Sequence, residues 1–253
     1  MAHKEQRTIF YRNFTDDVVT LAHQEYQTPA NFRYHHSKLF ALASYLLQTI
    51  VRIIAAPLGL WIMHTRIKNK VILKPYRNQA VYIYGNHTAP LGDVFKPFRI
   101  AHRLNIIVAP ANLKLPILGP LLPMGGAIPI PNSLHQYRGF LNEIANSIDH
   151  QKTLFIYPEA HVWPYSTIIR PFDDASFRYP IQNPAPVFCM TTTYQKSRWH
   201  KKPEAIVYLD GPFYPDENLS LKQQQRQLRD AVFNQMTKRS KLNNYEYIKY
   251  MKR

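Results

Sequence analysis

A histidine and an aspartate, His87 and Asp93, are spaced so that they could act together as a general base. They follow the apolar run at residues 80–84, so we expect His87 at the carboxyl end of a strand, where open α/β sheets bind ligands. A carboxylate that accepts the hydrogen of one imidazole nitrogen leaves the other nitrogen free to take a proton from an alcohol. In the alternative interpretation, His87 only ends the strand and Asp93 caps the next helix.

A second carboxylate, Glu159, follows another apolar run, at residues 153–157. Pro158 ends that run, because proline lacks the N–H group that a strand interior needs. The loop after Pro158 would carry Glu159 to the same edge of the sheet, so we expect it near His87. The alternative is a solvated loop residue, which is the commoner situation for a lone glutamate.

Short apolar runs alternate with longer amphipathic segments from residue 71 onward. This alternation predicts an α/β fold with a mixed, largely parallel sheet flanked by helices. The expected strands are residues 71–74, 80–84, 105–109, 127–130, 153–157, 187–192 and 205–210, and the expected helices are residues 92–103, 134–149, 174–180 and 219–240. After the last helix we expect a solvated, basic and tyrosine-rich tail.

Residues 39–63 are the most apolar part of the chain, and their length would suffice for one membrane-spanning helix. Arg52 lies near the middle of the segment, and Pro57 with Gly59 should break a helix in its second half. We therefore expect a membrane-associating helical hairpin that enters one leaflet; a single span and a soluble core hairpin are the alternatives. On this basis residues 1–70 form an N-terminal membrane-associating segment, and residues 71–253 form the α/β domain.

The composition limits the classes of function that remain. With 32 Lys and Arg against 16 Asp and Glu, the net charge of +16 favours contact with nucleic acid, anionic membranes or phosphorylated substrates. The single cysteine, Cys189, lies in an apolar run, so we expect it to be buried. The histidines lack paired metal-ligand spacing, and the chain contains neither a Gly-x-Ser-x-Gly sequence nor a nucleotide-binding glycine motif.

Four short segments, in order along the chain, resemble the motifs of the glycerolipid acyltransferases, a family that includes bacterial lysophosphatidic acid acyltransferases. The family's first motif, Asn-His-x4-Asp after a strand, is similar to Asn86-His87 and Asp93, with one extra residue between them. The other similar segments are the Gly125-Gly126 turn into residues 127–130, Tyr157-Pro158-Glu159 with Pro171-Phe172 after it, and residues 185–188. The resemblance covers residues 80–194, and an N-terminal membrane element of two helices also belongs to the family.

The resemblance implies an O-acyltransferase of the 1-acylglycerol-3-phosphate acyltransferase type. In it His87, oriented by Asp93, would deprotonate a hydroxyl that attacks a fatty-acyl thioester, with backbone N–H groups near the second and third motifs stabilising the oxyanion. Acyl-CoA or an acyl carrier protein would be the co-substrate, and no cofactor or metal would be needed. The predicted substrate-binding residues are Asn86, Gly125, Gly126, Glu159, His161 and Arg170.

The departures from the family pattern concern the acceptor. The arginines that hold the phosphate of lysophosphatidic acid in the family correspond here to Val162 and to residues 131–133. Guanidinium groups suit phosphate because they form two parallel hydrogen bonds, and Arg170, Arg138 or His161 would have to replace them here. The acceptor therefore stays open: a lysophospholipid, a glycolipid or a related hydroxylated lipid.

The polar residues 1–7 lack the pattern of a secretory signal peptide, so we expect a peripheral or monotopic protein at the cytoplasmic face of the cell membrane. Its partners would be the lipid surface, the thioester donor and the lipid acceptor. The alternative is a non-enzymatic basic protein that binds membrane surfaces or nucleic acid. We expect no nucleic-acid partner, because many Tyr and Phe residues lie within apolar patterns instead of alternating with basic residues.

Overall fold

The apolar runs of the sequence form a seven-stranded sheet with the strand order β2-β8-β7-β3-β6-β4-β5. The computed structural model describes residues 6–19, 26–29 and 31–253, so the polar residues 1–5 lie outside the described part. The strands are β2 (Thr65–Lys68), β3 (Val81–Gly85), β4 (Leu104–Val108), β5 (Ala127–Pro129), β6 (Thr153–Ile156), β7 (Val187–Gln195) and β8 (Glu204–Phe213). Neighbouring strands are parallel except for the antiparallel β7–β8 pair, which confirms the mixed, largely parallel sheet.

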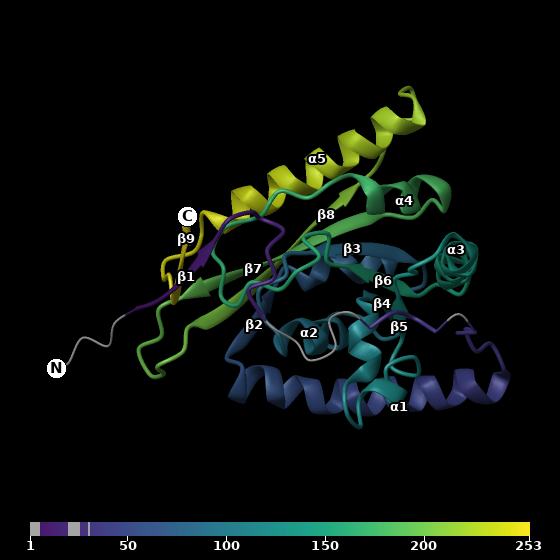
Figure 1. Cartoon of the computed structure of the whole chain (residues 1–253), viewed down its shortest axis with the longest axis horizontal. Helices are drawn as coiled ribbons and strands as arrows, with labels where there is room; N and C mark the ends of the chain where they lie inside the picture. Colours follow the sequence, from purple (N-terminus) through teal and green to yellow (C-terminus); the bar gives the residue numbers. More distant parts are fainter. Residues whose placement is uncertain (1–5, 20–25, 30) are drawn as a thin grey trace.

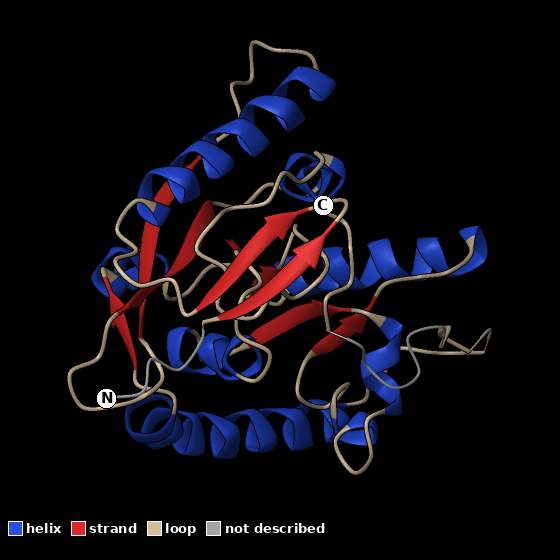
Figure 2. Cartoon of the chain, turned by 60° about the vertical axis from the view of Figure 1, so that its left-hand side comes forward, coloured by secondary structure: helices blue, strands red, loops and turns tan. Residues whose placement is uncertain are grey.

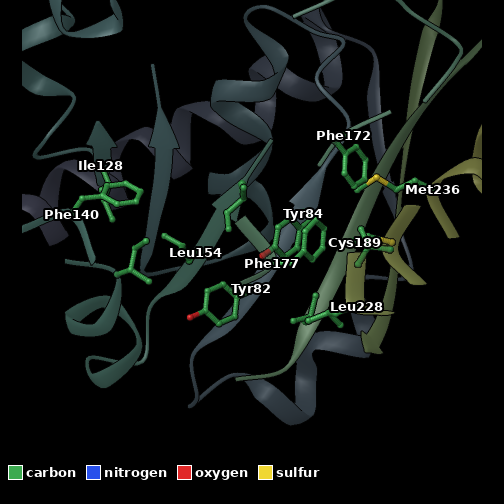
Figure 3. Packing of buried hydrophobic residues seen from close by; sticks show 14 residues of the cluster. Tyr82, Tyr84, Ile128, Phe140, Leu154, Phe172, Phe177, Cys189, Leu228 and Met236 are labelled. Carbon is green, nitrogen blue, oxygen red and sulfur yellow. The ribbon is translucent and has the colours of Figure 1, made fainter. Parts of the chain in front are cut away.

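Helices cover both faces of this sheet (Figures 1 and 2). They are α1 (Lys38–Pro57), α2 (Gly92–Ile100), α3 (Leu134–Asp149), α4 (Tyr179–Gln182) and α5 (Leu221–Ser240). The central strand β3 is buried on both faces, and its alternate side chains point to opposite layers. Tyr82 and Tyr84 belong to the core beneath α3 and α5 (Figure 3), whereas Val81 and Ile83 pack with α2 and α1. Cys189 is buried in the first of these cores, as expected.

The apolar N-terminal segment forms one helix instead of the expected hairpin. After Pro57 the helix continues as the π-helical turn η1 (Leu58–Ile62), in which the N–H of Met63 donates to the carbonyl of Leu58. The longer hydrogen-bond register lets the chain pass the proline without reversing direction. Gly59 faces α2, where a Cβ atom would lie 2.3 Å from the Arg99 guanidinium, so this glycine permits a close contact between helices instead of a break.

Residues Lys38–Ile62 are long and apolar enough to cross a membrane. Only 11% of the most apolar stretch is buried within the protein, unlike the core helix of a soluble protein, which would be mostly buried. The inward side of α1 carries small or polar residues, such as Ser44, Gln48 and Ala55. Larger apolar side chains point outward at spacings of three and four: Leu39, Leu42, Leu46, Ile50 and Ile53. The most hydrophobic side of α1 is therefore the exposed side.

Two other segments differ from the sequence-based expectation. Residues 71–74 lie in the 3-10 helix η2 (Lys70–Tyr76), because so short an apolar run does not distinguish a strand from a helical turn. The edge beside β8 is taken by β2, which the sequence pattern does not reveal. The tail is also not simply solvated, since β9 (Ile248–Lys252) pairs in parallel with β1 (Arg7–Tyr11). The first 70 residues thus contribute strands as well as α1, and the division at residue 70 stays a prediction.

Gly126 is required at the entry to β5. Its φ is +95°, and a Cβ atom there would lie 2.3 Å from the carbonyl oxygen of Leu104. We expect Gly126→Ala to lower the free energy of unfolding by about 1–3 kcal/mol in urea denaturation, from backbone strain alone. Gly139→Ala is the matched control: this glycine lies in α3, where a Cβ atom would make only an ordinary contact, 4.0 Å from Cε2 of Tyr34, so alanine should stabilise by about 0.5–1 kcal/mol. Equal effects at both positions would contradict the strain argument.

Candidate active site

The carboxyl end of β3 leads directly into the candidate site. Asn86, the residue after β3, is buried and continues the sheet with its side chain: its amide donates to the carbonyl of Thr192 at 3.0 Å and accepts the N–H of Thr192 at 2.8 Å. Asn86 therefore acts as a positioning residue that ties β3 to β7. This pairing sets the direction in which the next residue, His87, leaves the sheet.

The imidazole of His87 and the carboxylate of Asp93 are in hydrogen-bond contact, with Nδ1 2.8 Å from Oδ2. The residues between them form a tight turn, in which the N–H of Asp93 donates to the carbonyl of Ala89 at 2.7 Å. Gly92 allows this turn, since a Cβ atom there would lie 2.9 Å from that of Ala89. The His87 ring stacks on Tyr157 and its side chain is 23% exposed, whereas that of Asp93 is 2% exposed. Nε2 is thus the ring nitrogen that remains for a substrate.

Asp93 is the electrostatic centre of the turn. Its Oδ2 atom also accepts the N–H groups of Thr88 and Ala89 at 2.9 Å each, and its Oδ1 atom accepts a hydrogen bond from Lys96 at 2.6 Å. Burial by itself would raise the pKa of Asp93, but the Lys96 ammonium and the hydrogen bond with His87 outweigh it and lower the pKa to about 2. Asp93 is therefore a carboxylate at any ordinary pH, as an orienting partner for an imidazole requires.

Glu159 lies beside His87 but is held in a buried ion pair. Its carboxylate accepts the backbone N–H of His87 at 3.1 Å and that of Arg170 at 3.0 Å, and the Arg170 guanidinium donates to it at 2.9 Å. Arg170 also donates to the carbonyls of His161 and Phe14. The Glu159 and Arg170 side chains are 0% and 1% exposed. Substrate contact, which the sequence predicts for both, would require these side chains to leave the pair.

The loop after Glu159 is braced by the two ends of the chain. Trp163, which is fully buried, donates its backbone N–H to the carbonyl of His87 at 3.0 Å and its indole N–H to the carbonyl of Asp16 at 2.9 Å. Tyr250 from β9 stacks on the indole, and Tyr11 from β1 packs against it. The small β1–β9 sheet therefore supports the segment that holds His87 in place.

The remaining predicted residues lie apart from His87 or on the surface of the loop. Gly125 and Gly126 precede β5, whereas His87 follows β3; because the intervening strands are parallel, these glycines lie at the opposite edge of the sheet. An oxyanion contact from them would have to reach across the sheet. His161 is partly exposed, with Nδ1 3.4 Å from Oδ2 of Asp17.

Sequence reasoning missed two residues of the site, Lys96 and Trp163. Lys96 lies one helical turn after Asp93, a spacing at which side chains of opposite charge meet, so this signal was available. It also donates to the hydroxyl of Thr192 at 2.8 Å and so joins α2 to β7. The role of Trp163 depends on contacts with both chain ends, which no local pattern encodes.

The described residues offer no cluster of three or more His, Cys, Asp or Glu side chains that could hold a metal ion. A cavity of about 630 Å³ lies between Thr28, residues 31–36 and α3, and polar residues such as His36, Asn142 and Glu143 line it. Neither His87 nor Asp93 lines this cavity.

The arrangement of sheet and helices is similar to the fold of a solved glycerolipid acyltransferase. A solved structure that it resembles is the 1-acyl-sn-glycerophosphate (LPA) acyltransferase PlsC from Thermotoga maritima, with a TM-score of 0.58 and coverage of 81% of this chain and 89% of that chain. The two sequences are 12% identical, so the similarity shows the fold. No protein-family model and no curated protein matches the sequence.

Proposed function

We propose that this chain is an O-acyltransferase that moves a fatty-acyl group from acyl-CoA or an acyl carrier protein to a hydroxyl of a lipid acceptor. The observation that carries the proposal is the 2.8 Å contact between His87 Nδ1 and the Asp93 carboxylate. The contact lies at the carboxyl end of a central strand, where α/β sheets bind ligands. The acyltransferase fold, and the activity named for the Thermotoga protein, support the same reaction.

The proposed mechanism is direct transfer without an acyl-enzyme. Nε2 of His87 takes the proton of the acceptor hydroxyl as its oxygen bonds to the thioester carbonyl carbon. The C–S bond then breaks, the oxygen ester is released, and the imidazolium returns the proton to the thiolate. Asp93 stabilises the imidazolium between these two steps, since its carboxylate stays ionised.

The acceptor is proposed as a lysophospholipid, a glycolipid or a related hydroxylated lipid. The family arginine positions are occupied by Val162 and residues 131–133, and Arg170 is engaged with Glu159. A phosphate group on the acceptor would therefore need another cation.

We further propose that the enzyme works at the cytoplasmic face of a membrane, with the outward side of α1 in the lipid. The exposed leucines and isoleucines of α1 support this placement, because soluble proteins rarely leave so continuous an apolar stripe in water. The contact of the inward side of α1 with α2 favours a helix that lies along the membrane surface.

The test is an acyl-transfer assay with the full chain. Labelled acyl-CoA and labelled acyl carrier protein are each offered with lysophosphatidic acid, other lysophospholipids and glycolipid acceptors in mixed micelles. We expect at least one donor and acceptor pair to yield a labelled oxygen ester. Thioester hydrolysis without ester formation, or no turnover across the panel, would reject the proposed reaction and favour the non-enzymatic alternative.

A further inference from the structure

A second surface of the molecule has the chemistry of a lipid headgroup site. A cavity of about 340 Å³ lies between the end of the apolar helix and the turn that joins β7 to β8. Its lining residues are Leu60, Trp61, His64, Arg66, Trp199, His200 and Glu204, which we call the hairpin site. The hairpin site includes neither His87 nor Asp93, so it is separate from the proposed chemistry.

Tertiary contacts hold the β7–β8 turn against the helix end. The chain leaves the helix at His64, which has a φ of +44°, and enters β2 beside β8. The N–H of Ala205 donates to the carbonyl of His64 at 3.0 Å, and the rings of His64 and His200 stack with centroids 3.6 Å apart. The turn and the last residues of the helix lie on the same side of the molecule (Figure 1). The two elements therefore present one continuous surface.

Two of the three tryptophans of the chain are on this surface. Trp61 is 78% exposed and Trp199 is 85% exposed, whereas Trp163 is fully buried. Leu60 and Ile62 beside Trp61 are also exposed. Tryptophan favours the boundary between lipid and water, because its ring is apolar and its N–H group needs a polar partner. In water alone, no apolar environment would compensate for the cost of exposing these two indole rings.

Exposed basic residues lie near both tryptophans in the sequence. The exposed cations are Arg66 from β2 and, from the turn, Lys196, Arg198, Lys201 and Lys202. The opposing carboxylate is Glu204, which lies 3.8 Å from Arg66 and accepts a hydrogen bond from Ser197. Arg66 and the four cations of the turn beside the hairpin site therefore outnumber the carboxylate that lines it, so the charge of this surface suits an anionic lipid headgroup.

We infer that the hairpin site is a second membrane contact, which binds the phosphate of anionic phospholipids while Trp61 and Trp199 enter the interfacial layer. The hairpin site is continuous with the apolar helix, because Trp61 belongs to the end of that helix and Trp199 lines the same cavity. This continuity favours a lipid surface over an acidic protein as the partner. The inference rests on the membrane placement proposed for α1, but not on the acyl-transfer reaction.

The test measures binding of the full chain to vesicles of phosphatidylcholine alone and of phosphatidylcholine with phosphatidylglycerol. We expect the double variant Lys201→Gln/Lys202→Gln to lose about 10- to 30-fold in affinity for the anionic vesicles and little for the neutral ones. Trp199→Ala should lose about tenfold with both compositions. Since these side chains are exposed, thermal melting should not change.

A matched control removes the same charge from another surface. Lys238→Gln/Lys241→Gln affects exposed lysines at the end of α5, on the far side of the sheet from α1 (Figure 1). An equal loss in this control would mean that net charge alone attracts the vesicles, and it would overturn the site. Unchanged vesicle binding in the hairpin variants, with weaker binding of an acyl carrier protein, would assign the surface to that protein and also overturn the inference. Vesicle binding is measured without acyl transfer, so a failure of this inference can be distinguished from a failure of the proposed reaction.

Discussion

His87→Ala should lower kcat for acyl transfer by about 10²–10⁴-fold, because it removes the group that takes the proton from the acceptor hydroxyl. Asp93→Asn should lower kcat by an amount on the order of 10²-fold, since the amide cannot stabilise the imidazolium by charge. Both effects should appear in kcat with little change in KM, as expected for a group whose interaction strengthens in the transition state. The measurement is steady-state transfer with the donor and acceptor pair that the panel identifies.

Controls separate this catalytic role from damage to the fold. His150→Ala removes an exposed histidine at the end of α3 and should turn over like the unmodified protein. Asp93 also holds Thr88, Ala89 and Lys96, so the urea unfolding of Asp93→Asn must be measured alongside its activity. Near-normal turnover of a folded His87→Ala protein would refute the general-base assignment.

Arg170→Met should lower the free energy of unfolding by about 3–5 kcal/mol, because it leaves the buried Glu159 carboxylate without its positive partner. Burial raises the pKa of Glu159, and Arg170 and two backbone N–H donors oppose that rise. The double variant Glu159→Gln/Arg170→Met leaves no buried charge, and the single carbonyl oxygen of glutamine can still accept one of the two backbone N–H groups. We therefore expect it to lose less than the sum of the two single variants.

The matched control for this pair is Arg226→Met, which breaks an exposed ion pair between Arg226 and Asp174. Its cost should stay below about 1 kcal/mol, because solvent screens surface pairs. All variants are compared by urea denaturation at neutral pH. A cost for Arg170→Met as small as that of Arg226→Met would show that Glu159 has another source of stabilisation.

Much of the central architecture follows from local sequence patterns. β3, β6 and β7 are buried apolar runs with little polar alternation, which is typical of strands covered on both faces. Because the carboxyl ends of parallel strands share one edge, the order of residues also predicts that His87 and Glu159 lie close together. These conclusions need only the period of the pattern and the position of a residue relative to a strand.

Local sequence patterns do not predict the structure where one stretch of chain is compatible with two conformations. The proline at position 57 suggests a break, but contacts with α2 hold the helix end in line, and the chain continues after the proline as a π-helical turn. The basic tail likewise looks solvated until β1 provides a partner for β9. In both cases the deciding contact comes from a distant part of the chain.

Local sequence patterns thus predict the fold class, the strand that carries His87 and the carboxylates that follow it in the chain. Only the tertiary structure decided how these groups are used: Asp93 holds the imidazole with help from Lys96, whereas Glu159 is neutralised by Arg170. The physical reason is that burial makes an unpaired charge costly, so the partner that each buried carboxylate finds decides its role. Such partners are set by three-dimensional packing and not by spacing along the chain.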